Sequence, residues 1–375
     1  MKVSRHLVYV SNVVPGPGQG GRIVIDRHLR RLAAEGWSLT VVSPFSERAV
    51  PGPWREVCLP ARRWWWPPLR ATSPWLLSLR SRAWRRELSR AGVPPASAVA
   101  TICWGSLSWL AADLAVANSC PLIAIVHDWW GETGGAAETL IGRYVCASAK
   151  TVLVVSNEMQ AAVAAECSGT VDLLYPLPAS RTRPWAVWQG RYAKPTVAHV
   201  GALHGYHLEY LARVAAALKP LDGRLLLLCP RDNPVAKALR ARCPNLVHRD
   251  SFAANADALA WIAAEAGALT VMYPNDTSVT GQRATGFPSR LVEFSQLGLP
   301  VLLAAPLLNP IRTWATYRNW QGQVAPDDQA GIERWLLNLT LSKSWQRLAD
   351  DTRAAAETDF DPDHLHARFV FTLRN

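Results

Sequence analysis

The sequence lacks the cysteine patterns of disulfide-rich and zinc-binding proteins. Its 375 residues include seven cysteines, an odd number, and they are scattered singly with no Cys-x-x-Cys pair. Neither a disulfide framework nor a zinc site is therefore indicated. This cysteine usage fits a reducing compartment, so we expect a cytoplasmic protein.

The sequence also lacks a long uninterrupted apolar run. Its most apolar stretches, residues 107–126 and 256–273, are broken by charged or polar residues, proline or glycine, which argues against a membrane-spanning helix. The first apolar segment is short and soon meets Ser11 and Asn12, so no signal peptide is expected. We expect a protein that is soluble or associated with the inner face of the membrane.

Acidic residues are in the minority, at 29 against 40 lysines and arginines, which gives a formal net charge of +11. A basic surface suits the phosphates of nucleotides, nucleic acids or anionic lipids without choosing among them. Apolar residues make up 49% of the chain. With this length, two domains with real cores are expected.

Strand-like apolar runs alternate with helical segments along the whole chain. This alternation predicts an α/β fold of two doubly wound, Rossmann-like halves, with ligands bound beyond the carboxyl ends of the strands in a cleft between the halves. The expected strands are residues 6–10, 39–43, 98–103, 122–126, 151–155, 196–200, 224–229, 246–248, 269–273 and 300–303. The expected helices are residues 21–35, 107–117, 136–147, 158–166, 208–218, 233–242, 256–266 and 289–297.

Residues 175–195 are rich in Pro, Arg, Trp and Gly and have no periodicity, so they are the expected linker. We therefore expect an N-terminal domain over residues 1–180 and a second domain over residues 181–359. The remaining residues, about 360–375, are expected to form a last helix.

A short helix with a marked beginning and end follows Gly286. Pro288 suits its first position and Gly298 the position just after its end. Free amides at a helix start favour an anion, and Arg290 adds a fixed charge in the first turn. This pattern predicts a nucleotide-phosphate site at Ser289, Arg290 and Leu291.

Glu293 lies one turn further along the same helix face as Ser289. A carboxylate at that place could accept both hydroxyls of a ribose whose phosphates lie at the helix start. The alternative is that Arg290 and Glu293 form an ordinary exposed i,i+3 ion pair with no ligand.

Two other loops follow expected strands. Gly16-x-Gly18-x-x-Gly21 has the spacing of a dinucleotide fingerprint, but two prolines stiffen the loop and no acidic residue ends the second strand. A nicotinamide-dependent oxidoreductase is therefore disfavoured, and a turn without a ligand stays open. His127 and Asp128 directly follow residues 122–126, where active-site groups gather in such sheets, although a capped core histidine is also open.

These segments together resemble one enzyme family. Pro-Ser-Arg-Leu-Val-Glu-Phe at residues 288–294, with Gly-Leu-Pro-Val at 298–301, is similar to the Pro-Ser-Lys-Leu-x-Glu-Tyr-x-x-x-Gly-x-Pro-Val signature of GT-B glycosyltransferases of the family-four-like group. Gly20-Gly21 resembles the N-terminal Gly-Gly loop of that family. The segment that begins His127-Asp128 is similar to its His-Asp-x-x-Pro-Glu segment, with Gly131 in place of the proline, and Gly201 lies in a loop like the one that opens its second domain.

The resemblance implies a hexosyltransferase-like enzyme that moves a sugar from a nucleoside diphosphate-sugar to an acceptor hydroxyl, without a metal or another cofactor. Acceptors of this class include lipid-linked and polysaccharide precursors. The donor phosphates would meet Arg290, the amides of residues 289–291, Gly201, Gly20 and Gly21. Ribose would meet Glu293, and the sugar His127. The last helix of this family commonly packs back on the first domain.

By the same resemblance, Thr285 is expected among the residues that bind the nucleotide-sugar. It stands where many retaining members carry the first of two glutamates, so the stereochemistry is open. Retention is favoured by analogy, whereas inversion would make Asp128 or His127 the general base. The alternative from another class is a non-catalytic basic GT-B-like protein that binds membrane or nucleic acid.

Tryptophan and arginine are interleaved between Arg62 and Arg86. Tryptophan prefers the membrane interface and arginine the anionic headgroups, which suggests peripheral membrane contact. Single-stranded nucleic acid is the competing partner, although it is not the expected one. An ordinary basic surface loop would explain the same residues.

Overall fold

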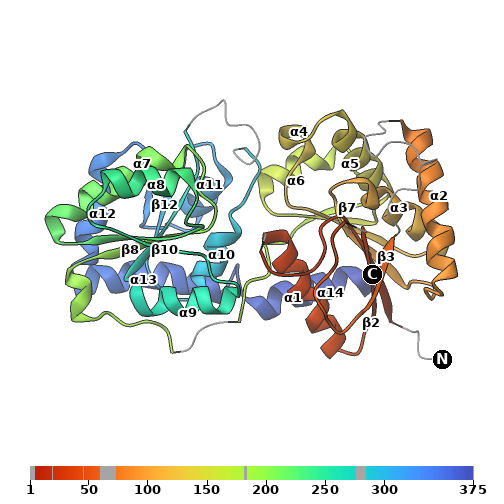
Figure 1. Ribbon diagram of the computed structural model, residues 1–375, viewed down its shortest axis with the longest axis horizontal. Coiled ribbons are helices and arrows are strands. Elements are labelled where there is room, and N and C mark those ends of the chain that lie inside the picture. The colour runs from red at the N-terminus through yellow and green to blue at the C-terminus, as the bar shows by residue number, and fades with distance from the viewer. Residues whose placement is uncertain are drawn as a thin grey trace. The chain divides into compact units, whose positions relative to one another are not determined.

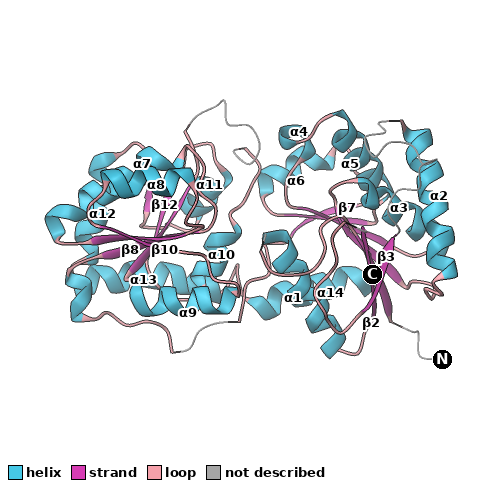
Figure 2. Cartoon of the chain, viewed as in Figure 1, coloured by secondary structure: helices cyan, strands magenta, loops and turns pink. Residues whose placement is uncertain are grey.

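The computed structural model describes residues 5–18, 20–44, 46–59, 73–180, 184–275 and 284–374. The chain divides into two compact α/β units (Figures 1 and 2). Unit 1 consists of Met1–Leu177, Ala284–Phe287 and Asp363–Asn375, and unit 2 consists of Pro178–Arg283 and Pro288–Pro362. The chain first passes from unit 1 to unit 2 after Leu177, three residues before the expected boundary at residue 180.

Unit 1 contains a seven-stranded parallel sheet in the order β3-β2-β1-β4-β5-β6-β7. Strands β1, β4 and β5 are buried at every residue, which explains their unbroken apolar runs, since helices cover both faces of a parallel sheet. The strands are β1 His6–Val10, β2 Ser38–Pro44, β3 Arg55–Leu59, β4 Ala98–Ile102, β5 Leu122–Val126, β6 Thr151–Val154 and β7 Thr170–Leu173.

The helices of unit 1 lie on both sides of this sheet (Figure 1). Helix α3 packs between α2 and α5 on one side, and α1 and α14 lie together on the other. The helices are α1 Gly20–Ala34, α2 Pro74–Arg90, α3 Ser106–Asn118, α4 Trp130–Thr133, α5 Ala136–Ser148, α6 Asn157–Ala164 and α14 Pro362–Arg374.

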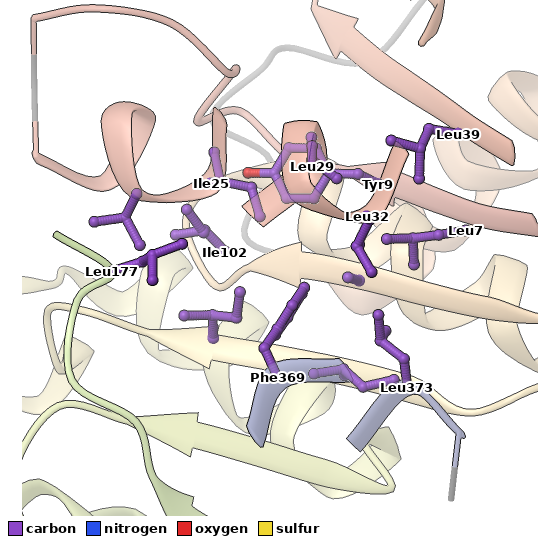
Figure 3. Packing of buried hydrophobic residues seen from close by; sticks show 14 of the residues in the cluster. Leu7, Tyr9, Ile25, Leu29, Leu32, Leu39, Ile102, Leu177, Phe369 and Leu373 are labelled. Carbon is purple, nitrogen blue, oxygen red and sulfur yellow. The ribbon is translucent and has the colours of Figure 1, made fainter. Parts of the chain in front are cut away.

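A buried apolar cluster joins α1 and α14 to the strands of unit 1 (Figure 3). Leu29 of α1, Tyr9 of β1 and Phe369 of α14 are each 0% exposed. Burying a side chain of this size contributes about 1.5–3 kcal/mol. The last helix of the chain is therefore part of the core of unit 1.

Unit 2 contains a six-stranded parallel sheet in the order β10-β9-β8-β11-β12-β13. Figure 1 shows α7 and α8 on one face and α9, α10 and α13 on the other. The strands are β8 Thr196–Val200, β9 Arg224–Leu228, β10 Leu246–Arg249, β11 Ala268–Met272, β12 Val301–Ala304 and β13 Gln323–Val324. The helices are η1 Gly190–Ala193, α7 His207–Leu218, η2 Lys219–Leu221, α8 Pro234–Arg242, α9 Asn255–Glu265, α10 Ser289–Ser295, α11 Pro310–Tyr317, α12 Gln329–Leu339 and α13 Ser342–Glu357.

The predicted fold class, two doubly wound halves, is confirmed. The strands expected at residues 6–10, 122–126 and 196–200 have those bounds in the structure. Helix α2 was not predicted, although Leu77, Trp84 and Leu88 are buried along it. Its five arginines obscured the apolar spacing in the sequence.

The second half of the segment expected as the linker, residues 175–195, packs on unit 2. Tyr192 is 2% exposed and stacks on Trp345 with ring centroids 5.4 Å apart. The ring of Trp185 lies against Gly298, where a Cβ would come within 2.8 Å of it. These residues pack on unit 2, because aromatic side chains can be buried even where a segment has no regular structure.

Two buried histidines connect α1 and α14. Nδ1 of His28 and Nδ1 of His366 are 3.1 Å apart, and His366 Nε2 lies 3.1 Å from Glu35 Oε1. Burial lowers the pKa of both rings. The pKa of His28 is lowered further by His366 and Arg31. The pKa of His366 is raised by Glu35 and lowered by Arg31, and the net shift is downward. One proton can bridge the two Nδ1 atoms, but two protons in that contact would repel each other.

This pair predicts a loss of stability in mild acid. The folded pKa values lie below the unfolded value of about 6.5, so the unfolded chain binds protons first as the pH falls. The free energy of unfolding should therefore be full above about pH 6.5 and should decrease below it, by about 1.4 kcal/mol for each unit of pKa shift. Thermal melts between pH 8 and pH 5 measure this, and His366→Gln should flatten the dependence.

The matched control is His364→Gln, because His364 is exposed on the same helix. It should keep the pH dependence of the unchanged protein, to which the other buried histidines also contribute. Equal slopes for the two variants would contradict the role of the pair.

Candidate functional site

The first candidate site lies in unit 2, where β8 ends at the turn that contains Gly201. Arg290 of α10 reaches this turn. Its Nη2 donates to the carbonyl of Ala202 at 3.0 Å, and its Nη1 lies 3.4 Å from Nε2 of His199. The predicted residues Gly201 and Arg290 are thus brought together.

Gly201 makes this approach possible. Its φ is +98°, a backbone conformation that favours glycine, and a Cβ at this position would lie 3.1 Å from Arg290 Nε and 3.2 Å from its Cζ. The guanidinium therefore lies directly against the peptide backbone of the turn.

Among the described residues, Arg290 has no carboxylate partner for its positive charge. His199 is 1% exposed, and burial, then Arg290, hold its pKa well below the usual range, so the ring is neutral and its Nε2 can accept. Burial also lowers the pKa of Arg290, whereas Tyr206 and Tyr273 act in the opposite direction and favour its charged form. Across residues 184–275 and 284–374, no Asp or Glu forms an ion pair with Arg290.

Glu293 lies one turn after Arg290 but bonds to other groups. Its Oε1 accepts from Asn255 Nδ2 at 2.5 Å, and its Oε2 accepts from the amide of Ala179 at 3.2 Å. Both Arg290 and Glu293 are half-buried. The simple exposed ion pair considered above therefore does not describe these side chains.

The start of α10 differs from the prediction in detail. Pro288 is the residue before the helix rather than its first residue, and the amide of Leu291 donates to the carbonyl of Pro288 at 3.0 Å. Three amides were expected to be free. Those of Ser289 and Arg290 have no intrahelical acceptor, because they lie in the first turn of the helix. Gly298 has a φ of +66° and lies beyond the helix end, as predicted.

The second candidate site lies in unit 1. β5 ends at Val126, so His127 and Asp128 follow it at the carboxyl edge of the sheet. Gly21, in the first turn of α1 after Gly20, faces the imidazole, and a Cβ on it would lie 3.0 Å from His127 Nδ1. Burial lowers the pKa of His127, partly opposed by Asp128, so the neutral ring predominates at pH 7.

Thr285 also belongs to unit 1, and its side chain is 4% exposed. Its carbonyl accepts a 2.5 Å hydrogen bond from Oγ of Ser156. Ser156 also caps α6 by accepting from the amide of Met159 at 3.0 Å. Thr285 is thus an internal residue of a segment that Ser156 anchors, and it does not present its hydroxyl to solvent.

Sequence reasoning missed the residues that position the predicted ones. His199 and Ala202 hold Arg290, Asn255 and the Ala179 amide hold Glu293, and Ser156 holds the Thr285 segment. Only His199 had a visible signal, as a polar residue within the apolar run of β8.

Comparisons with known proteins agree with this architecture. Residues 18–172 match the family model described as Glycosyltransferase Family 4. No curated protein matches the sequence. Among solved structures, the chain is similar to sucrose-phosphate synthase from Thermosynechococcus elongatus, with a TM-score of 0.71 and 14% identity over 98% of both chains.

Two further solved structures have the same fold. Anabaena HepE in complex with UDP and glucose has a TM-score of 0.67 and 12% identity, over 99% of both chains. WaaG, a glycosyltransferase involved in lipopolysaccharide biosynthesis, has a TM-score of 0.64 and 16% identity, over 98% of this chain and 99% of its own.

The close contact at Gly201 gives a testable prediction. Gly201→Ala places a Cβ in a left-handed conformation and against the guanidinium, so it should lower the free energy of unfolding by about 1–2 kcal/mol. Chemical denaturation measures this. Gly205→Ala is the matched control, because a Cβ there meets no atom within 4 Å; it should change stability by less than about 0.5 kcal/mol, and an equal loss in both variants would contradict the assignment.

Proposed function

We propose that this chain, a glycosyltransferase of the GT-B type, takes a sugar from a nucleoside diphosphate-sugar and transfers it to an acceptor hydroxyl with retention of configuration. The observation that carries the proposal is the half-buried charge of Arg290, held by a carbonyl and a neutral histidine. A half-buried cation with no carboxylate partner among the described residues is a site that an anion can complete.

The diphosphate of the donor is the proposed anion. Arg290 is fixed against Gly201, so it can meet the charge that develops on the leaving diphosphate without rearrangement. The amides of Ser289 and Arg290 add donors at the same place. In this proposal the positive charge comes from arginine and backbone amides rather than from a metal.

Glu293 is the proposed ribose-binding residue. Asn255 and the Ala179 amide fix the orientation of its carboxylate, and each carboxylate oxygen has two lone pairs, so it can accept from a ribose hydroxyl as well. The complex of Anabaena HepE with UDP and glucose supports a nucleoside diphosphate as the donor class.

Unit 1 supplies the proposed sugar and acceptor groups. Gly20 and Gly21 offer backbone amides at the start of α1, and the neutral His127 ring lies against Gly21. During transfer, the bond between the acceptor oxygen and the anomeric carbon forms on the face from which the diphosphate leaves, and the hydroxyl proton passes to the departing phosphate. His127 then orients the sugar, and lipid-linked or polysaccharide precursors are the proposed acceptors.

Arg290→Ala should abolish transfer while the fold stays intact. Truncating one partner of a buried charge pair costs 2–5 kcal/mol or more, which lowers nucleotide affinity by at least roughly 30-fold. Thermal-shift titrations with UDP, GDP, TDP and ADP identify the base and measure the loss. Arg240→Ala removes an exposed arginine of the same unit and should bind like the unchanged protein.

No stabilisation of the unchanged protein by any of these nucleotides would instead favour a non-catalytic binder. Near-normal turnover of Arg290→Ala with radiolabelled nucleotide sugars and membrane extract would disprove the phosphate assignment.

Asp128→Asn separates retention from inversion. If transfer retains configuration, Asp128 is not the general base, and the variant should keep turnover within about tenfold of the unchanged protein. A general base contributes roughly 10²–10⁴-fold, so a loss in that range, together with an inverted anomer by NMR of the product, would show an inverting mechanism.

A further inference from the structure

Helix α2 carries an exposed stripe that neither candidate site uses. Trp75, Leu79, Arg82, Arg86 and Arg90 are all exposed, and their spacings of four, three, four and four residues place them on one side of the helix. The opposite side is buried in unit 1 through Leu77, Ser81, Trp84 and Leu88. We call the five exposed residues the α2 stripe.

The apolar end of the α2 stripe is unusually open. Trp75 is 66% exposed and Leu79 is 38% exposed, one helical turn apart. A single exposed apolar residue is ordinary, but an indole and a leucine side by side offer a contiguous apolar surface. Tryptophan is the residue that prefers the boundary between water and lipid.

The other end of the α2 stripe is strongly basic. The helix contains five arginines and one glutamate, a net charge of +4 from these groups. Arg90 pairs with Glu87, whereas Arg82 and Arg86 have no hydrogen-bond or ion-pair partner in the part of the chain that the structure describes. A surface depression of about 480 Å³ is lined by Arg82, Arg85, Arg86, Ser89 and Arg90, a set of donors suited to phosphate oxygens.

The order of residues along the stripe favours a lipid surface over nucleic acid. Stacking of bases needs successive exposed aromatic rings, but Trp84 is buried, with its ring 5.6 Å from the guanidinium of the buried Arg80. Of the two aromatic residues of α2, Trp75 and Trp84, only Trp75 is exposed, and Leu79 beside it cannot stack. An apolar pair followed by arginines matches a bilayer interface, where acyl chains meet lipid phosphates.

We propose that the α2 stripe binds the surface of an anionic bilayer. Trp75 and Leu79 enter the boundary between headgroups and acyl chains, and Arg82, Arg86 and Arg90 contact lipid phosphates. From Trp75 to Arg90 the stripe is about 22 Å long at about 1.5 Å per residue, so the helix lies along the membrane. No helix among the described residues is long and apolar enough to cross a membrane.

The α2 stripe differs in its residues from the membrane contact expected over Arg62–Arg86. Residues 60–72 lie outside the described residues. Of the remainder, Arg80 and Trp84 are 3% and 6% exposed and belong to the core side of α2. The binding surface is therefore the exposed stripe and it extends to Arg90.

Flotation of the full chain with vesicles tests the proposal. The protein should bind vesicles of phosphatidylcholine with about one third phosphatidylglycerol, should bind far less to pure phosphatidylcholine, and should dissociate when salt is raised. Arg82→Gln, Arg86→Gln and Arg90→Gln together should weaken binding by roughly 100-fold, because each arginine near an anionic surface contributes about a fivefold factor.

The matched control removes the same charge elsewhere. Arg240, Arg334 and Arg347 are exposed on three helices of unit 2, and their triple glutamine variant should bind vesicles within about threefold of the unchanged protein. Trp75→Ser with Leu79→Ser should weaken binding while the salt dependence stays the same. Circular dichroism melts check that each variant is folded.

Equal losses in the two triple variants would mean that net charge, rather than the α2 stripe, drives binding, and would overturn the proposal. Equal binding to neutral and anionic vesicles would also overturn it. The proposal would also be overturned if the protein bound a single-stranded oligonucleotide but not vesicles, and if the α2 triple variant abolished that binding. None of these measurements depends on sugar transfer, so the proposal is independent of the proposed enzymatic function.

Discussion

The contact between Arg290 and the turn after β8 is the constraint on which the candidate site of unit 2 depends. The guanidinium can lie against the turn only because Gly201 has no side chain and a φ of +98°, and it can bond His199 only because that ring is neutral. Position, orientation and charge are thus fixed together. A site built in this way needs no rearrangement when charge develops on a bound phosphate, so the proposed catalysis follows from the packing.

The fold could be predicted because parallel strands covered on both faces leave continuous apolar runs. Residues 122–126 and 196–200 have the same bounds in the sequence and in the structure. Helix α2 could not be found in the same way, because its buried side includes Arg80 and Ser81. An apolar periodicity is lost when a helix buries polar groups, and only the packed structure shows which face is inside.

The functional residues were easier to predict than their partners. Arg290 and Gly201 belong to motifs, but His199 lies 91 residues before Arg290, and the amide that binds Glu293 lies 114 residues before it. Contacts over such separations leave no local pattern in one sequence. The amide of Leu291 was misjudged for a different reason: its bond to Pro288 depends on the backbone geometry of the first turn, which residue types do not determine.

The segment before α10 adds a constraint that no motif predicts. Ala284–Phe287 belongs to unit 1 and Pro288 to unit 2, so the residue that precedes α10 is one peptide bond from a segment of the other unit. Ser156 bonds the carbonyl of Thr285, and the Phe287 ring lies 4.7 Å from that of Tyr175. These contacts hold the end of that segment within unit 1. Thr285 is 4% exposed and its carbonyl is hydrogen-bonded to Ser156, so its role in unit 1 is structural.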